Sequence, residues 1–519
     1  MESCFPHHLA LRKEMNAWLD QSLRMDPPSR HGGGEDEANY ALSWIPHYLL
    51  TRSPAVKEHF QYLRDLLAGW VDRECEHGYE PEAEAHHGTE PFLLFLPRFL
   101  GLFPDDETGR SLLADAAEHI GNWVDDVPDW FDWGENRFKG YHIGSRVVDQ
   151  DPDSVVELAE HFRFIHIALS AHRVLADDRY LDWALNYGGR RAEMILAAPE
   201  GSLPVMWGSK GEPLWEADLN DAQNRMSASS HHVAGDPLAG VEVLLASGAI
   251  YALGDLFRAS GKAMFRDAAM RIAEPLVSQL GDPYADPSAA ALSYYRWAFS
   301  DDSLDSRIGE MISRMPSEEK GELVLMVPES SRMVLPGPGK RADMIHWGVQ
   351  TQSQRLVSSA SEPCTAALAL AYKMTGETGY AGRALRQAHR KLKTARRVLR
   401  GGREHADMGG AICSVAAGHG RNWGWGAVTG CYGPLLLGTN LVNGSVEARI
   451  EVKGGQREGH PDALLSLVCD RPRDCCRVGF YNGGQQTLEF DWRSSGSTWQ
   501  AASLGAGRSI EFKVDDSGQ

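Results

Sequence analysis

Apolar residues recur at the 3.6-residue spacing of amphipathic helices along most of this 519-residue chain. In 153–175, for example, Val155, Leu158, Phe162 and Ile165 fall on one stripe. The other segments with this spacing are 8–24, 37–50, 55–77, 90–101, 107–126, 178–197, 237–260, 262–280, 286–299, 302–315, 361–375 and 378–399. A pattern repeated this often predicts a mainly α-helical protein.

Three stretches of the chain share one form, in which a helix ends, a short polar turn follows, and an aromatic residue opens the next helix. They are "AHRVLADDRYLDWAL" (171–185), "LGDLFRASGKAMFRDAA" (253–269) and "LAYKMTGETGYAGRA" (370–384). Repeated helical hairpins cannot bury their apolar faces alone, so they stack on their neighbours. Six or seven antiparallel hairpins can close into a ring, so we expect an (α/α)6 or (α/α)7 toroid.

The connections between the predicted helices are uneven in length. The turns inside a hairpin are short, whereas the segments between hairpins are long; these are 78–89, 127–152, 198–236, 316–360 and 400–427. Long connections in a compact domain are usually functional. Because they recur at the same place in each hairpin unit, we expect them to gather on one face of the ring.

The sequence texture changes after about residue 440. "GSVEARIEVKG", "CRVGFYNG", "QTLEFDW" and "RSIEFKVDD" alternate apolar and polar residues and are separated by Gly, Asn and Asp. This pattern is typical of short antiparallel strands. We therefore expect a helical catalytic domain over 1–440 and a small antiparallel β module over 441–519.

The overall charge of the chain bears on its partners and its location. The net charge is −19, which argues against binding to nucleic acid or to anionic membranes. No run of about 18 apolar residues is present, and the N-terminus lacks a signal-peptide pattern. The eight Cys are scattered, without the paired spacing of zinc sites. We expect a cytoplasmic protein with reduced thiols and no metal or cofactor.

A ring of hairpins with long loops and a C-terminal β module resembles the (α/α)-toroid carbohydrate-active enzymes. These include polysaccharide lyases, unsaturated-uronyl hydrolases and sugar 2-epimerases. The turn "TGETGY" (375–380) looks like theirs, as does "GHGRNWGWGAVTGCYGPLLLG" (418–438), which would close the ring. The resemblance covers about residues 37–440 and implies sugar chemistry, but it does not choose the reaction.

The segment "DDVPDWFDWGENRFKGYHIGSR" (125–146) is the densest in functional side chains. Aromatic faces stack on pyranose rings, while Asn and Arg bind hydroxyls and carboxylates. The alternative is an irregular loop packed by its own aromatic residues. The substrate-binding residues predicted here are Trp133, Asn136, Arg137, Tyr141, His142 and Arg146.

Two stretches supply the predicted catalytic residues. "NRMSASSHHVAGDP" (224–237) places Asn224, His231 and His232 before a predicted helix, and imidazole is the natural acid or base near neutral pH. The alternative is a helix-entry loop with a His bonded to the backbone. "SYYRWAF" (293–299) adds Tyr295 and Arg296 from a predicted helix.

Further substrate contacts are expected from three other long connections. "EAEAHHGTEPF" (82–92) carries imidazoles and a carboxylate just before a helix, although a solvated acidic loop with a helix cap is an alternative. The residues predicted to bind substrate in these connections are His86, His87, Glu90, His346, Arg421, Asn422 and Trp423.

Among the reactions of such toroids, β-elimination from a uronic-acid-containing glycan matches these side chains best. His231 or His232 and Tyr295 would serve as base and acid, while Asn224, Arg296 or a His would neutralise the uronate carboxylate. Hydrolysis by paired carboxylates is the first alternative. Its candidates are Glu90, Asp129, Asp132, Glu135, Asp218 and Asp221. Epimerisation by two His, or a non-catalytic carbohydrate-binding ring, would also fit.

Overall fold

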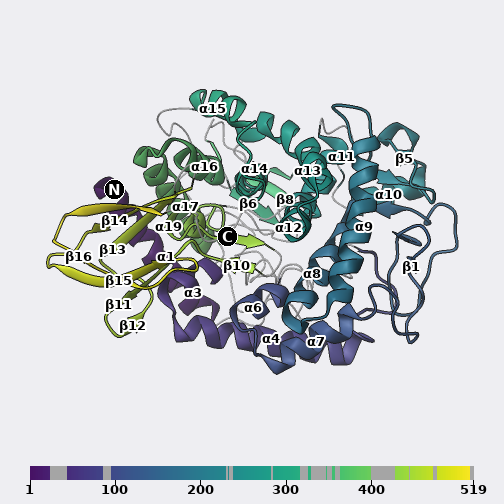
Figure 1. Ribbon diagram of the computed structural model, residues 1–519, viewed down its shortest axis with the longest axis horizontal. Coiled ribbons are helices and arrows are strands. Elements are labelled where there is room, and N and C mark those ends of the chain that lie inside the picture. The colour runs from purple at the N-terminus through teal and green to yellow at the C-terminus, as the bar shows by residue number, and fades with distance from the viewer. Residues whose placement is uncertain are drawn as a thin grey trace.

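The computed structural model shows a mainly helical protein with a small antiparallel β module near the C-terminus (Figure 1). Both features confirm the fold class expected from the sequence at this level. The structure describes residues 1–23, 44–85, 95–229, 232, 238–281, 285–315, 325–328, 346–347, 353–356, 363–398, 427–442, 445–470 and 476–514.

The three repeated stretches of sequence form three helical hairpins with the same turn. The pairs are α8 (Arg163–Leu175) with α9 (Asp178–Ala197), α12 (Ala249–Ser260) with α13 (Ala263–Leu276), and α16 (Thr365–Thr375) with α17 (Thr378–Val398). The first helix ends at Ala176, Gly261 or Gly376, each in the left-handed conformation with φ of 56°, 69° and 74°. A left-handed residue at this position satisfies a terminal carbonyl and reverses the chain.

The two helices of a hairpin differ in burial. Residues 163–171 of α8 and 365–373 of α16 are buried without interruption, so these helices are covered on every face. Their partners bury one stripe; in α9 it includes Tyr180, Trp183 and Tyr187, at the spacing of a helix face. The helical part therefore has an inner and an outer layer.

The remaining helices extend these two layers along the chain. They are α1 (Phe5–Ser22), α3 (Trp44–Thr51), α4 (Pro54–Glu74), α6 (Leu96–Leu102), α7 (Glu107–Ala117), α10 (Asp221–Ser229), α11 (Ala239–Ala246), α14 (Asp286–Ala298), α15 (Asp305–Ser313) and α19 (Tyr432–Leu436). Between hairpins, α9 packs on α13, α12 on α14, α14 on α16, α1 on α17, and α3 on α19. Within the described ranges, no single helix has both the length and the apolar character needed to cross a membrane.

Neighbouring inner helices run in the same direction. Tyr294 of α14 donates a hydrogen bond to Asp255 of α12 (2.7 Å), and the Arg258 guanidinium lies 4.4 Å from the Trp297 ring centroid. Residue numbers therefore rise together along α12 and α14. Because the long connections precede inner helices, they enter at the N-terminal ends of these helices, and the short hairpin turns lie at the opposite ends.

Two small antiparallel sheets form the β module. One has the order β12-β11-β15-β16 and the other β13-β14-β17. The strands are β11 (Ile450–Gly454), β12 (Arg457–Glu458), β13 (Leu464–Cys469), β14 (Cys476–Asn482), β15 (Leu488–Ser494), β16 (Gln500–Leu504) and β17 (Ser509–Val514). Phe480 and Phe512 of one sheet contact Phe490 and Trp492 of the other, so the sheets share an aromatic core.

The β module is fastened to the helices by backbone and ring contacts. Phe5 packs on Tyr481 with ring centroids 5.8 Å apart, and the His460 amide donates to the Leu50 carbonyl (2.7 Å). Cys469 lies against the end of α16 and, like the other cysteines in the described ranges, is a free thiol.

Short strands also form among the helical connections. They pair as β1 (Phe131–Asp132) with β2 (Arg137–Phe138), β3 (Glu157–Leu158) with β4 (Met206–Trp207), β4 with β5 (Pro213–Leu214), β6 (Leu325–Pro328) with β8 (Ser353–Leu356), β7 (His346–Trp347) with β8, and β9 (Asn440–Val442) with β10 (Ser445–Glu447). The first strands of the C-terminal region thus begin at residue 440.

Candidate functional site

Two of the long connections lie against each other. The Ile143 amide donates to the Ala83 carbonyl (2.8 Å), and the Ser145 amide donates to the Glu80 carbonyl (2.7 Å). These backbone bonds join the segment after α4 to the segment before α8. The structure therefore brings together two connections that the sequence separates by two helices.

A third long connection joins the same layer. Strand β3, which leads into α8, pairs with β4 from the connection that leads into α11. Beneath the strands, a small apolar cluster contains Tyr141, Val156, Leu158 and Met206, separate from the main core. The three connections thus form one continuous layer at the N-terminal end of the inner helices.

His232, one of the predicted catalytic residues, lies in this layer between two carboxylates. Its Nδ1 is 3.3 Å from Oε1 of Glu242 in α11, and its Nε2 is 3.8 Å from Oε2 of Glu216. The side chains of His232 and Glu242 are only 2% and 1% exposed, whereas that of Glu216 is 36% exposed. A buried carboxylate beside an imidazole can orient the ring and stabilise its protonated form.

Further buried ionisable groups lie close to this pair. The 3-10 helix η3 (Ala159–Phe162) contacts α11 and carries Glu160, which is fully buried. Arg163 follows it directly, at the start of α8, and is also buried. Burial lowers the pKa of the neighbouring His161 to about 4, so that ring stays neutral near pH 7. The layer therefore places acid, base and guanidinium groups at the entrance of the inner helices.

Tyr295 and Arg296 lie at the other end of an inner helix, in the last turn of α14. The Tyr295 hydroxyl donates to Asp301 (2.8 Å), and Arg296 makes two bonds to Asp305 (2.6 and 2.7 Å). Burial and the bond to Asp301 raise the pKa of Tyr295, which keeps the phenol protonated. Both side chains thus hold the connection from α14 to α15, and the site proposed below does not include them.

The Tyr295→Phe variant tests this structural role. We expect the turnover number to stay close to that of the wild type, while the free energy of unfolding falls by about 1–2 kcal/mol because the buried phenol loses its hydrogen bond to the Asp301 carboxylate. Turnover assays and urea unfolding measure the two quantities. A fall in turnover of about 100-fold with stability preserved would instead place Tyr295 in the active site.

Asn224 and the first half of the aromatic segment lie on the outside of the layer. Asn224 is exposed on α10 and bonds the Leu219 carbonyl. Trp133 is 47% exposed in the turn between β1 and β2, and Asn136 in the same turn has a φ of 49°. Arg137 bonds the adjacent Phe138 carbonyl. Trp133, Asn136 and Arg137 thus belong to a surface hairpin, whereas Asn224 lies on α10, whose Ser227 carbonyl accepts the His232 amide (2.8 Å).

The second half of that segment binds the connection after α4. Tyr141 donates to the Glu84 carboxylate, and Arg146 pairs with Glu76. His142 Nδ1 lies 2.8 Å from Asp149, and this hydrogen bond raises the pKa of His142. These predicted substrate residues thus have protein partners that hold the layer together.

The remaining predicted site residues have side chains that the structure does not describe. The residues outside the described ranges are His86, His87, Glu90, His231, Arg421, Asn422 and Trp423. For His346, the structure describes the backbone, which belongs to β7.

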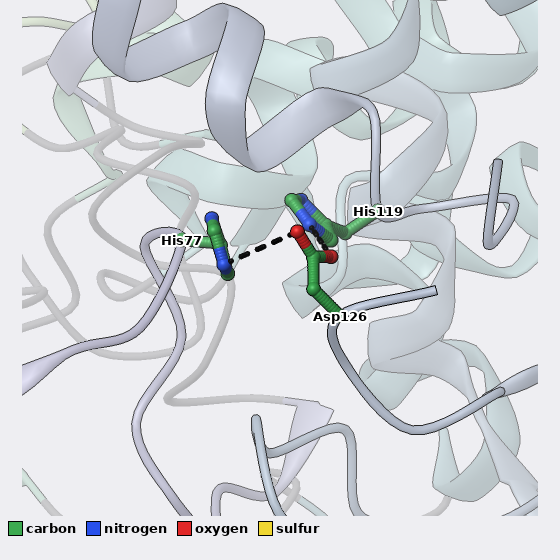
Figure 2. Close-up of side chains that lie close together, drawn as sticks. All are labelled: His77, His119 and Asp126. Atoms are coloured by element: carbon green, nitrogen blue, oxygen red, sulfur yellow. Dashed lines mark hydrogen bonds and ion pairs between the residues drawn. The ribbon is translucent and has the colours of Figure 1, made fainter. Parts of the chain in front are cut away.

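A second cluster in the layer was not predicted from the sequence (Figure 2). His77 Nδ1 lies 2.9 Å from Asp115 Oδ1, and His119 Nδ1 lies 2.6 Å from the Asp115 carbonyl oxygen. The Nε2 atoms of His77 and His119 are 3.5 and 2.7 Å from the two carboxylate oxygens of Asp126. The ligand atoms of these three residues lie close enough together to hold one metal ion.

The electrostatics of this cluster follow from its hydrogen bonds. The bond to Asp115 raises the pKa of His77, although partial burial opposes the shift. Burial acts against a lower pKa for Asp126, but hydrogen bonds from His119 and from the backbone, together with the charges of His119 and His77, hold the pKa below its usual value. The cluster therefore favours a charged carboxylate facing two imidazole rings.

Local backbone structure positions the cluster. Glu76 and Tyr79 exchange both backbone hydrogen bonds around His77 and Gly78, whose φ values are 55° and 85°. Positive φ at both central residues defines a type I′ turn, and His is an uncommon residue at such a position. The sequence "EHGY" contains the glycine of this turn, but nothing in it indicates the partners from 115–126.

Comparison of the chain with models of protein families, with curated proteins and with solved structures gives no match. The function is therefore argued from the geometry of the chain itself.

Proposed function

We propose that the helical part of this chain is an (α/α) toroid of the kind found in carbohydrate-active enzymes. The proposal is supported by the fully covered α8 and α16, which have the burial of an inner ring. Contacts between α1 and α17 and between α19 and α3 join the two ends of the helical region. In such a ring the N-terminal ends of the inner helices meet at one opening, where the layer of long connections would form the substrate site.

Within this fold we propose a lyase that cleaves a uronic-acid-containing glycan by β-elimination. The observation that carries the proposal is the His232–Glu242 pair, buried in the layer. With the ring proton placed on Nδ1, 3.3 Å from the Glu242 carboxylate, the Nε2 lone pair would be the basic atom of the ring. His232 would take the C5 proton of the uronate, and Glu242 would stabilise the resulting imidazolium.

The remaining electron flow needs no further covalent partner. The C5–H electron pair forms the C4=C5 double bond, and the C4–O bond to the leaving sugar breaks. When the C5 proton and the C4 oxygen leave from the same face of the sugar ring, the imidazolium can return its proton to the leaving oxygen. Neutralising the uronate carboxylate lowers the barrier to removal of the C5 proton. We assign this neutralisation to Arg163, which is buried and directly follows η3.

Hydrolysis is the second candidate, because Glu216 and Glu242 face the two nitrogens of His232 from different elements. Two carboxylates flanking a glycosidic bond can act as general acid and base or nucleophile. Two of the carboxylates considered from the sequence have other contacts. Asp129 pairs with Lys139, and Asp132 accepts bonds from the backbone of its own turn.

Incubation of the full chain with polyuronates and their oligosaccharides distinguishes these reactions. A lyase product gains ultraviolet absorbance, because its new double bond is conjugated with the carboxylate, and it also gains a reducing end. We expect both signals to rise together. Reducing ends without new absorbance would contradict elimination and favour hydrolysis. Neither signal with any uronate glycan would contradict both.

A further inference from the structure

We propose that His77, His119 and Asp126 form a binding site for a divalent transition metal ion, and that zinc is the ion their chemistry suits best. Imidazole nitrogens and carboxylate oxygens are its usual ligands together with cysteine sulfur. The site is independent of the proposed lyase reaction, and no sequence motif pointed to it. Figure 2 shows the two rings directed at the same carboxylate.

The hydrogen bonds to Asp115 determine which ring nitrogen carries the proton. A carbonyl oxygen only accepts, so the 2.6 Å contact requires a proton on His119 Nδ1. The Asp115 carboxylate accepts from His77 Nδ1 in the same way. Metal-binding histidines use this arrangement, in which a carbonyl or carboxylate holds one nitrogen and the other nitrogen faces the metal.

The neutral form of this cluster is electrostatically incomplete. With both Nδ1 atoms protonated, the two Nε2 atoms direct lone pairs at the oxygens of Asp126, 2.7 and 3.5 Å away. A proton on His119 Nε2 would convert the 2.7 Å contact into a charge-assisted hydrogen bond to Asp126, but His77 Nε2, 3.5 Å from Asp126 in a ring stacked 4.5 Å away, would still face the carboxylate with its lone pair. One divalent cation bound to both Nε2 atoms and to Asp126 neutralises the carboxylate and satisfies all three groups.

The geometry needs only small adjustments to accept the ion. Ligand atoms in a tetrahedral zinc site are about 3.3 Å apart, given bond lengths near 2 Å. The two nitrogen–oxygen distances bracket this value. His119 is fully buried, whereas Asp126 is 44% exposed. The exposed side of the cluster leaves room for water as a further ligand.

The position of the cluster indicates what the ion would do. His77 comes from the turn after α4, His119 from the end of α7, and Asp126 from the segment that leads toward β1. A metal ion would therefore fasten two separate stretches at the edge of the connection layer, the turn after α4 and the segment from α7 to β1. Such a site acts as a clamp, stabilising the folded layer by binding it more tightly than the unfolded chain.

Titration of the chelator-treated full chain with zinc sulfate tests the proposal. We expect one zinc ion per chain by calorimetry and a higher midpoint of thermal unfolding with zinc. Cobalt(II) in its place should give the visible absorption of a four-coordinate nitrogen and oxygen site. Absence of stoichiometric zinc binding by the wild type would overturn the proposal and leave an ion-pair network.

Variants identify the ligands. His77→Ala and Asp126→Ala should abolish stoichiometric zinc binding, and both positions are partly exposed, so folding should persist. Asp115→Asn, which alters a positioning residue, should weaken binding by about 10- to 100-fold. The matched control is His172→Ala, because His172 Nδ1 also faces a carbonyl and a carboxylate, whereas no second imidazole joins these contacts in the described part of the chain. Zinc binding that survives in His77→Ala and Asp126→Ala, or is lost equally in His172→Ala, would refute the assignment.

Discussion

The variant His232→Gln is expected to turn over a uronate-containing glycan at least about 100-fold more slowly than the wild type. Glutamine keeps much of the size and polarity of the side chain but cannot accept and release a proton at neutral pH. Glu242→Gln should also lower turnover, because a neutral amide stabilises the imidazolium less than a buried carboxylate does. Initial rates of double-bond formation measure both effects.

Two controls separate chemistry from folding in this experiment. Thermal unfolding of His232→Gln shows whether replacement of a buried side chain has disturbed the layer, since His232 is 2% exposed. The His172→Ala variant changes a histidine near the α8–α9 turn, at the opposite end of the inner helices, and should retain wild-type rates. If His232→Gln is folded and as active as His172→Ala, His232 is not the base.

Gly144→Ala is expected to destabilise the protein by about 1–3 kcal/mol, the range for overpacking at a tight contact. A Cβ at position 144 would lie 2.4 Å from the Pro81 carbonyl oxygen and 2.5 Å from Glu82 Cα. These are backbone atoms, so rotation of a side chain cannot relieve the overlap. The connection after α4 would have to separate from the one before α8, which breaks the hydrogen bonds that join them.

The matched control is Gly189→Ala, in the middle of α9. Apart from the backbone of the helix itself and the neighbouring residues, no atom lies within 4 Å of a Cβ built at this position, and the backbone is helical. Alanine should therefore stabilise the helix by about 0.5–1 kcal/mol, through lower backbone entropy in the unfolded chain. Urea unfolding compares the two variants. Equal stabilities would show that residue 144 does not limit the approach of the two connections.

The helical hairpins could be predicted from sequence because their signals are local. The polar turn and following aromatic residue recur in three stretches, and the structure gives all three the same left-handed residue at the helix end. At the first turn this residue is Ala176 rather than glycine, so residue type alone would have missed it. The β module was predicted from its alternation for the same reason, since strand periodicity is a local property.

The candidate site could be predicted only in part. His232 stood out as an imidazole in a polar stretch before a helix, but its partner Glu242 was missed. The signal was present, because Glu242 is the one acidic residue in the apolar run "AGVEVLLASGA" and its burial requires a partner. Tyr295 and Arg296 have suitable chemistry, yet they lie at the hairpin-turn end of α14, where they hold Asp301 and Asp305.

The existence of most helices, the turns within hairpins and the C-terminal strands follow from the sequence, because each depends on the periodicity and conformational preferences of a few neighbouring residues. Helix limits were partly wrong: the predicted helix 153–175 begins only at Arg163, after β3 and η3, and the predicted helix 107–126 ends at Ala117. The contacts between polar side chains of the candidate sites depend on the tertiary structure. His77 belongs to one connection and His119 and Asp126 to another, and His232 meets Glu216 and Glu242 from different elements. Such meetings depend on how distant connections pack over the ends of the helices, and no spacing along the chain encodes that packing.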